Sequence, residues 1–121
     1  MQEQDKRLPD RARVVIVGGG IAGASVAYHL AKLGWNEVLL LEQGRLAGGT
    51  SWHAAGMVGR LRTSSSMTKI NQYSVDLYST LEQETGVPTG WKQVGSLIVA
   101  RCKERMVQLR RTVAMAEYLG V

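Results

Sequence analysis

The pattern of apolar and polar positions near the start of the chain predicts two short strands joined by a helix. Val14–Val17 is a β-branched run that ends at a glycine, and EVLLL at residues 37–41 is a second apolar run. Continuous runs of this kind are typical of parallel strands that are buried on both faces. Between them, apolar positions over residues 21–33 follow a helical spacing that ends at Gly34. Together they predict a right-handed βαβ unit.

The pattern then weakens before a second helix. Residues 43–66 show little periodicity and many small or hydroxyl residues, so we expect a long functional loop with one helical turn near Trp52. From Met67 the apolar residues return to a helical spacing. Ser66 is the expected N-cap of this helix, and Gly86 is expected just past its end.

The last part of the chain predicts a strand and a helix. SLIVA at residues 96–100 is the expected strand, and the turn region before it could include a short strand at residues 91–94. A final helix is predicted over residues 103–119, followed by Gly120. A sheet with two parallel strands cannot cover its own faces and edges, so we expect these elements to be the front of a longer fold.

Composition narrows the class of protein. The 121 residues are 45% hydrophobic and 21% charged, as in one small globular domain. The formal net charge of +5 is spread along the chain without a recognition motif, so a nucleic-acid partner is not expected. The single cysteine, Cys102, excludes an internal disulfide. No apolar run is long enough for a membrane span, and the N-terminus lacks an apolar signal core.

Residues 18–23, GGGIAG, match the G-x-G-x-x-G pattern between the first strand and the first helix. Gly18 would permit the tight turn out of the strand, and Gly20 would let a pyrophosphate approach the backbone. Gly23 would let the helix pack closely on the strand. The free N–H groups at the helix start favour a phosphate.

Glu42 lies at the end of the second strand, 19 residues after Gly23. Its carboxylate can accept hydrogen bonds from the adenosine ribose hydroxyls and would repel a 2′-phosphate. These features predict a dinucleotide site, and FAD and NAD satisfy them equally.

RLAGGTSWHAAG at residues 45–56 follows the acidic residue directly. Here the sequence resembles the glycine oxidase and D-amino-acid oxidase superfamily of flavoproteins, and within it the dimethylglycine and sarcosine dehydrogenases. In that group a Gly-(Ser/Thr)-(Ser/Thr)-Trp-His-(Ala/Thr)-Ala-Gly stretch follows the acid. The resemblance continues through LYSTLEQETG and GSLIVA and covers residues 13–120. An NAD-dependent enzyme remains an alternative, but it would leave GGTSWHAAG unexplained.

The resemblance implies an α/β fold with a Rossmann-like FAD-binding βαβ unit, followed by the start of a mixed α+β substrate domain. Residues 1–12 would be a disordered arm, and residues 13–66 would form the FAD-binding unit and the flavin loop. Residues 67–121 would supply the helix, strand and helix that begin a truncated substrate domain.

The resemblance also implies which residues contact FAD. His53 corresponds to the histidine that is bonded covalently to the 8α-methyl carbon of the flavin, a link that should raise the reduction potential. The alternative for His53 is a non-covalent contact or a turn cap. Ile21 and Ala22 would touch the pyrophosphate, and Glu42 and Gln43 would lie at the ribose. The residues expected around the ribityl chain and ring edge are Gly49, Thr50, Ser51, Trp52, His53, Ala54, Ala55, Gly56 and Met57.

The remaining polar residues carry weaker expectations. Arg60 and Arg62 could help to bind a substrate carboxylate or the flavin, but we favour solvated or ion-paired roles. His29 lies in the middle of the first predicted helix and is expected to be structural. No catalytic base is assigned, because the family supplies that group mainly from parts of the chain beyond residue 121.

The implied activity is that of an FAD-dependent amine dehydrogenase or oxidase. It would oxidise an N-methyl group of a small amino acid such as dimethylglycine or sarcosine by hydride transfer to the flavin. Electron-transfer flavoprotein or oxygen would accept the electrons, and tetrahydrofolate would bind only beyond this segment. The location would be the cytoplasm in a bacterium or the mitochondrial matrix in a eukaryote. The alternative is a regulatory subunit of the pyruvate dehydrogenase phosphatase type, which shares this flavoprotein body and acts through protein interaction.

Overall fold

The computed structural model describes residues 8–121, which form two compact units. The first unit ends at Ala55 and the second begins at Gly56. The predicted arm at residues 1–12 lies largely outside the described residues. Its described part, residues 8–12, has no helix or strand. The functional boundary at residue 66 stays a prediction.

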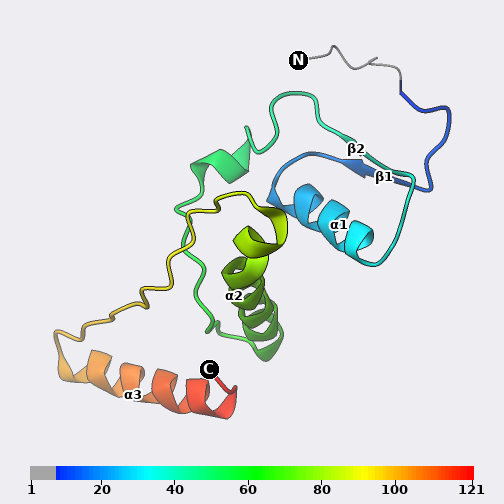
Figure 1. The fold of residues 1–121 in the computed structure, drawn as a ribbon. Helices are drawn as coiled ribbons and strands as arrows, with labels where there is room; N and C mark the ends of the chain where they lie inside the picture. The colour runs from blue at the N-terminus through cyan, green and yellow to red at the C-terminus, as the bar shows by residue number, and fades with distance from the viewer. Residues whose placement is uncertain (1–7) are drawn as a thin grey trace. The chain divides into compact units, whose positions relative to one another are not determined.

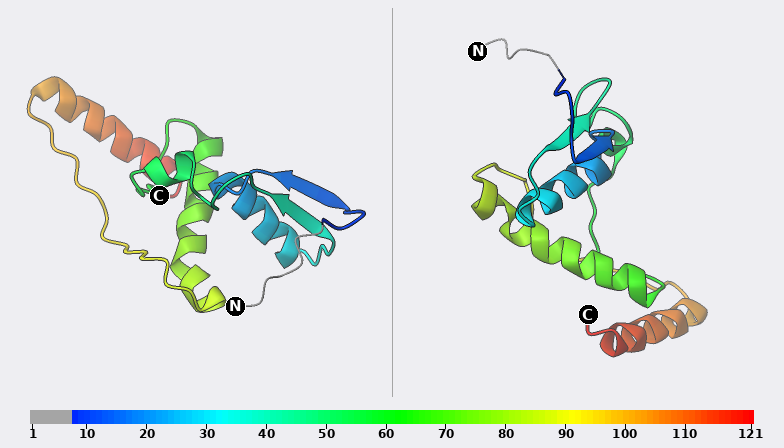
Figure 2. Two further views of the ribbon diagram at one scale, coloured as in Figure 1. Left: turned by 90° about the horizontal axis from the view of Figure 1, so that it is seen from above. Right: turned by 90° about the vertical axis from the view of Figure 1, so that its right-hand side faces the viewer.

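The first unit is a βαβ unit, as the sequence predicted (Figure 1). It consists of β1 (Val14–Val17), α1 (Ile21–Lys32) and β2 (Val38–Leu41). The two strands are parallel, and their register runs from Val14 beside Val38 to Val17 beside Leu41. Helix α1 packs against both strands, and the views in Figure 2 show it along the sheet. A short 3₁₀ turn, η1 (Thr50–His53), follows near Trp52, where a helical turn was expected.

The end of α1 forms the hydrogen-bond pattern that glycine favours after a helix. Gly34 has a left-handed φ of 77°, and its N–H donates to the Ala31 carbonyl at 2.9 Å. The Trp35 N–H donates to the Leu30 carbonyl at 2.9 Å. This pair of bonds is a Schellman motif, which reverses the chain toward β2.

The second unit contains two long helices, α2 (Ser65–Thr85) and α3 (Lys103–Tyr118). Gly86 ends α2 in a left-handed conformation with a φ of 69°, as expected. The prediction that Ser66 is the N-cap was wrong. Ser64 holds that position, because its backbone is extended and its hydroxyl accepts a hydrogen bond from the Met67 N–H at 3.3 Å.

The predicted strand at residues 96–100 was also wrong, and the possible short strand at residues 91–94 is absent as well. The whole of residues 87–102 has neither helix nor strand and follows an extended path (Figure 1). A strand requires a neighbour for its backbone hydrogen bonds, and the described residues offer none to this segment. Val94, Leu97 and Val99 are therefore 86%, 89% and 73% exposed.

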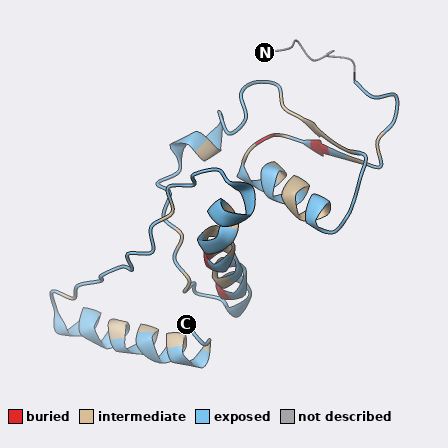
Figure 3. Cartoon of the chain, in the orientation of Figure 1, coloured by how far each residue is buried: buried red, intermediate tan, exposed pale blue. Residues whose placement is uncertain are grey.

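The core is small within the described chain. The buried residues there are Ile16 on β1, Gly19 in the turn that follows it, and Thr68 and Val75 on α2 (Figure 3). The Thr68 hydroxyl donates to the Arg62 carbonyl at 3.1 Å and accepts from the Arg62 N–H at 3.0 Å. These two bonds fasten the preceding loop to α2. Most large apolar side chains are left exposed, a pattern expected where further protein surface covers them.

Candidate functional site

The glycine turn between β1 and α1 has the geometry that its sequence predicted. Gly18 has a φ of 101°, and its N–H donates to the Leu41 carbonyl on β2 at 2.7 Å. A Cβ atom on Gly23 would lie 1.9 Å from the Gly18 carbonyl oxygen and 3.3 Å from Ile16 Cγ2. Only glycine at position 23 therefore allows the helix to approach the strand this closely.

The N-terminus of α1 presents backbone donors without a side-chain cap. Its N-cap residue is Gly20, which has an extended backbone. The Ile21 N–H donates to Ser51 Oγ at 2.9 Å, across 30 positions of sequence. The N–H groups of Ala22 and Gly23 have no acceptor among the described residues. Unpaired donors at the positive end of a helix dipole suit a phosphate group.

Glu42 lies beside this turn, at the end of β2. Its Oε2 atom accepts a hydrogen bond from the Gly19 N–H at 2.7 Å, and its Oε1 atom accepts one from the Gly44 N–H at 2.9 Å. The pKa of the carboxyl is lowered, first by the Gly19 N–H, then by the Gly44 N–H, and more weakly by the Gln43 N–H, against a small opposing effect of burial. The group is therefore an ionised acceptor with lone pairs left for ribose hydroxyls.

The segment after Glu42 folds back over the glycine turn. The Ala47 N–H donates to the Gly19 carbonyl at 2.9 Å, and the Gly48 N–H donates to the Arg45 carbonyl at 2.9 Å. The sequence analysis missed both Gly19 and Ala47. Gly19 occupies a variable position of the fingerprint, and the contacts of Ala47 are made through its backbone, so neither left a signal in residue type.

The 3₁₀ turn η1 contains two of the predicted site residues, Ser51 and His53, and each has a contact within the first unit. Ser51 contacts the start of α1, and a Cβ atom on Gly20 would lie 3.1 Å from its hydroxyl oxygen. His53 Nδ1 lies 3.2 Å from the carbonyl oxygen of Gly49. Because a carbonyl can only accept, Nδ1 carries the hydrogen, and Nε2 of the neutral ring keeps its lone pair.

The predicted site residues are therefore grouped as follows. The first unit holds the glycine turn, Glu42, Gln43 and the loop through Ala55, whereas Gly56 and Met57 belong to the second unit. Within the first unit the direct contacts join the glycine turn to Glu42 and to Ser51. The side chains of Trp52 and Met57 are exposed. A dinucleotide fits this arrangement, because the free N–H donors at the start of α1 and the ionised carboxylate at the end of β2 both adjoin the glycine turn.

The second unit has a cavity of about 980 Å³, lined mainly by residues 56–62 and 89–96. Arg60 is one of the lining residues, and its Nη2 atom is ion-paired with Asp76 Oδ1 on α2 at 2.8 Å, in line with the expected ion-paired role. Trp91 stacks on Tyr78 with ring centroids 5.5 Å apart. The buried Trp91 Nε1 has no hydrogen-bond partner among the described residues.

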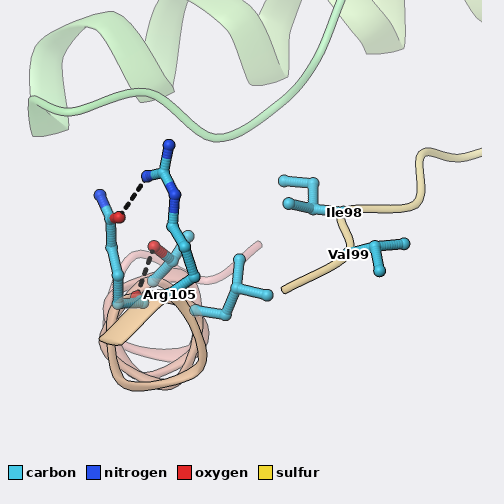
Figure 4. A pocket seen from close by; sticks show the side chains of 6 residues that line it. Ile98, Val99 and Arg105 are labelled. Atoms are coloured by element: carbon cyan, nitrogen blue, oxygen red, sulfur yellow. Dashed lines mark hydrogen bonds between the residues drawn. The ribbon is translucent and has the colours of Figure 1, made fainter. Parts of the chain in front are cut away.

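A smaller pocket of about 310 Å³ lies between the extended segment and α3 (Figure 4). Ile98 and Val99 line one side. On the other side, Arg105 Nη1 donates to Gln108 Oε1 at 2.5 Å. The lining includes no acid, histidine or cysteine, so this pocket offers no group for acid–base or nucleophilic chemistry.

Residues 8–121 contain neither a metal-binding cluster nor a membrane-spanning helix. No group of three or more histidine, cysteine, aspartate or glutamate side chains in this part of the chain could hold a metal ion. None of its helices combines the length and the apolar character that crossing a membrane requires.

Comparison with known proteins decides the family. Residues 13–121 match the family described as FAD dependent oxidoreductase, or DAO. The chain belongs to this family.

Three curated relatives show how similar the chain is to longer proteins. It is 48% identical over 114 residues to 4-methylaminobutanoate oxidase (formaldehyde-forming) of Paenarthrobacter nicotinovorans, covering 94% of the chain and 14% of the relative. It is 47% identical over 114 residues to the mitochondrial pyruvate dehydrogenase phosphatase regulatory subunit of Mus musculus, covering 94% and 13%. It is 40% identical over 121 residues to human mitochondrial sarcosine dehydrogenase, covering 99% and 13%. The chain thus spans only 13–14% of the length of these relatives.

A solved structure supports the fold. The L-amino acid deaminase from Proteus vulgaris superposes on the whole chain with a TM-score of 0.86 and 23% identity, over 28% of its own length. This DAO-family chain therefore shares the fold of the matching part of that deaminase, and its described residues form a two-stranded parallel sheet with a predominance of helix.

Proposed function

We propose that this DAO-family chain is the FAD-binding part of an oxidoreductase that oxidises the N-methyl group of a small amino acid. The observation that carries the proposal is the shared location of three features. Free N–H groups of Ala22 and Gly23, the ionised Glu42 carboxylate and the loop that bears His53 all lie in one unit. The names of relatives, among them sarcosine dehydrogenase and 4-methylaminobutanoate oxidase, support a methylated amine as substrate.

The residues of this chain would hold FAD at both of its polar regions. The N–H groups of Ala22 and Gly23 would bind the pyrophosphate, with the Ile21 N–H already bonded to Ser51. Glu42 would accept hydrogen bonds from the adenosine ribose, and Gln43 follows at the same edge. When bound, the flavin supplies an acceptor for hydride.

His53 would attach the flavin covalently. Its Nδ1–H faces the Gly49 carbonyl at 3.2 Å, so the lone pair available for bonding is on Nε2. The backbone carbonyl thereby selects the tautomer that presents a nucleophilic nitrogen away from the η1 turn. The remaining contacts with the ribityl chain and ring edge would come from the side chains of Thr50 and Trp52 and from the backbone of residues 54–57.

The test of this proposal is flavin content after expression of the chain with excess FAD. We expect yellow protein whose colour survives acid precipitation, with the adduct on the peptide that contains His53. His53→Ala should still bind FAD but release it in acid. His29→Ala is the matched control, because it removes the other histidine, and it should keep the acid-stable colour. A colourless wild-type protein, or an adduct on another peptide, would contradict the proposal.

The substrate proposal needs a separate measurement on the longer protein that contains this chain. Oxidation of an N-methyl group followed by hydrolysis of the iminium releases formaldehyde. We expect formaldehyde from sarcosine or dimethylglycine, with electrons passed to electron-transfer flavoprotein or to oxygen. In air without an added acceptor only an oxidase would turn over, whereas without oxygen but with electron-transfer flavoprotein only a dehydrogenase would.

The second candidate is a regulatory subunit of the pyruvate dehydrogenase phosphatase type. The 47% identity to the mouse subunit favours it. This candidate predicts no formaldehyde from either amine and co-purification with a phosphatase catalytic subunit. Two relatives are named as mitochondrial and one is bacterial, so we propose the mitochondrial matrix for a eukaryotic source and the cytoplasm for a bacterial one.

A further inference from the structure

Gly19, the second residue of the glycine turn, is bonded on both sides of its peptide. Its N–H donates to Glu42 Oε2 at 2.7 Å, across 23 positions of sequence. Its carbonyl accepts from the Ala47 N–H at 2.9 Å. The residue therefore joins the end of β2 to the loop that follows it.

The space around Gly19 is also filled. A Cβ atom on Gly19 would lie 2.5 Å from Leu46 Cδ2, 3.2 Å from Glu42 Cβ and 3.3 Å from Glu42 Cγ. Leu46 is exposed and its tip can rotate away at little cost. The Glu42 atoms lie close to the backbone of β2, so they can yield only if the carboxylate moves. The φ of Gly19 is not in the left-handed region. Position 19 therefore requires glycine because a side chain would have no space, not because of its backbone conformation.

We infer that Gly19 is a positioning residue for ribose recognition: its N–H and its missing side chain together hold the Glu42 carboxylate toward the adenosine ribose. The inference rests on the proposed function, since it assigns a role within the same dinucleotide site. Its basis is the pair of contacts between Gly19 and Glu42, the N–H bond and the filled space. The carboxylate also accepts a bond from the nearby Gly44 N–H, and no cation among the described residues is ion-paired with it.

A side chain at position 19 should act on one part of the ligand. Gly19→Ala would push the first carbons of Glu42 away by a few tenths of an ångström and lengthen the 2.7 Å bond. The free N–H groups of Ala22 and Gly23 would stay in place, so binding of the phosphates should persist. The expected defect is a loss of selectivity for the ribose hydroxyls.

The experiment compares ADP with 2′,3′-dideoxy-ADP by calorimetric titration of the 121-residue chain. Wild type should prefer ADP. Gly19→Ala should weaken ADP binding about 3- to 10-fold, as expected for one impaired hydrogen bond to a charged group. Binding of the dideoxy compound should be unchanged, which a merely unfolded or loosened variant would not show. Glu42→Gln should show the same loss of preference.

Two control variants test whether the new methyl group acts on Glu42 directly. Gly59→Ala adds the same methyl group at a site where the nearest atom is Arg62 Nη1 at 3.7 Å, and it should match wild type. Leu46→Ala should also keep the preference for ADP. If Leu46→Ala reproduces the effect of Gly19→Ala, the cover that Leu46 provides is responsible, and the inference is overturned.

A second measurement needs no Gly19 variant and follows the chemical shift of the Gly19 amide proton in NMR spectra. In wild type its shift should follow the protonation of a carboxyl group during acid titration, and Glu42→Gln should abolish that response. The Gly59 amide should not respond. A Gly19 amide that is unaffected by Glu42→Gln would overturn the inference. Wild type that binds neither FAD nor ADP would instead reject the proposed function, which keeps the two failures distinct.

Discussion

The close packing of Gly23 against the Gly18 carbonyl predicts that Gly23→Ala will disrupt the glycine turn. The new Cβ atom would lie 1.9 Å from an oxygen, whereas real Cβ atoms essentially never come within 3.0 Å. The gap must therefore widen by about 1 Å. Gly18 is held in turn by the 2.7 Å bond from its N–H to the Leu41 carbonyl, so the turn cannot move without straining the link to β2.

The magnitude follows from two destabilising effects and one stabilising effect. Overpacking of this kind costs about 1–3 kcal/mol, and straining the Gly18 bond adds about 1 kcal/mol. Alanine within a helix stabilises by about 1 kcal/mol relative to glycine. The net expectation is a loss of about 1–3 kcal/mol in the free energy of unfolding. With a urea dependence of about 2 kcal/mol per molar, the midpoint should fall by about 0.5–1.5 M.

The assay is urea denaturation followed by far-UV circular dichroism, together with FAD titration. Gly59→Ala is the matched control and should unfold at the wild-type midpoint or slightly above it, since it meets no close atom. Gly23→Ala should also bind FAD more weakly, because the N–H groups at the start of α1 shift with the turn. A Gly23→Ala chain with the wild-type midpoint and wild-type FAD affinity would refute the steric reasoning.

Two further predictions concern single side chains. Thr68→Val keeps the shape of a buried residue but removes both bonds to the Arg62 backbone. Amide exchange at Arg62 should therefore accelerate about 10- to 30-fold, equivalent to about 1.4–2 kcal/mol. Thr80→Val, at an exposed site on the same helix, should leave this exchange rate unchanged. Because the pKa of Glu42 is lowered in the folded chain, its contribution to stability is complete above the unfolded pKa, near 4.5, and is lost as the pH falls through the lower folded pKa. FAD affinity should likewise be unchanged at pH 6 and should decline only below about pH 4.5. If the affinity of Glu42→Gln declines by the same factor over this pH range, the account is contradicted.

Local sequence determined the βαβ unit and the two long helices. Residue type alone favours an extended backbone in the β-branched run of β1 and the apolar run of β2. It likewise favours turns at Gly18 and Gly34 and a close approach of helix to strand at Gly23, so these elements can be predicted without knowledge of distant contacts. The helical spacing of α2 and α3 does the same. The resemblance on GGTSWHAAG likewise led to the family that residues 13–121 match.

Tertiary structure decided the rest, because it depends on which groups meet across long stretches of chain. Residues 96–100 have the composition of a strand but no neighbour in the described chain with which to form a ladder. Ser64 rather than Ser66 caps α2, because the backbone leaves the helix there. The bonds from Ile21 to Ser51 and from Gly19 to Glu42 span 30 and 23 positions, and residue type alone cannot reveal such contacts. A hydrogen bond depends on distance and direction, and folding brings those atoms together.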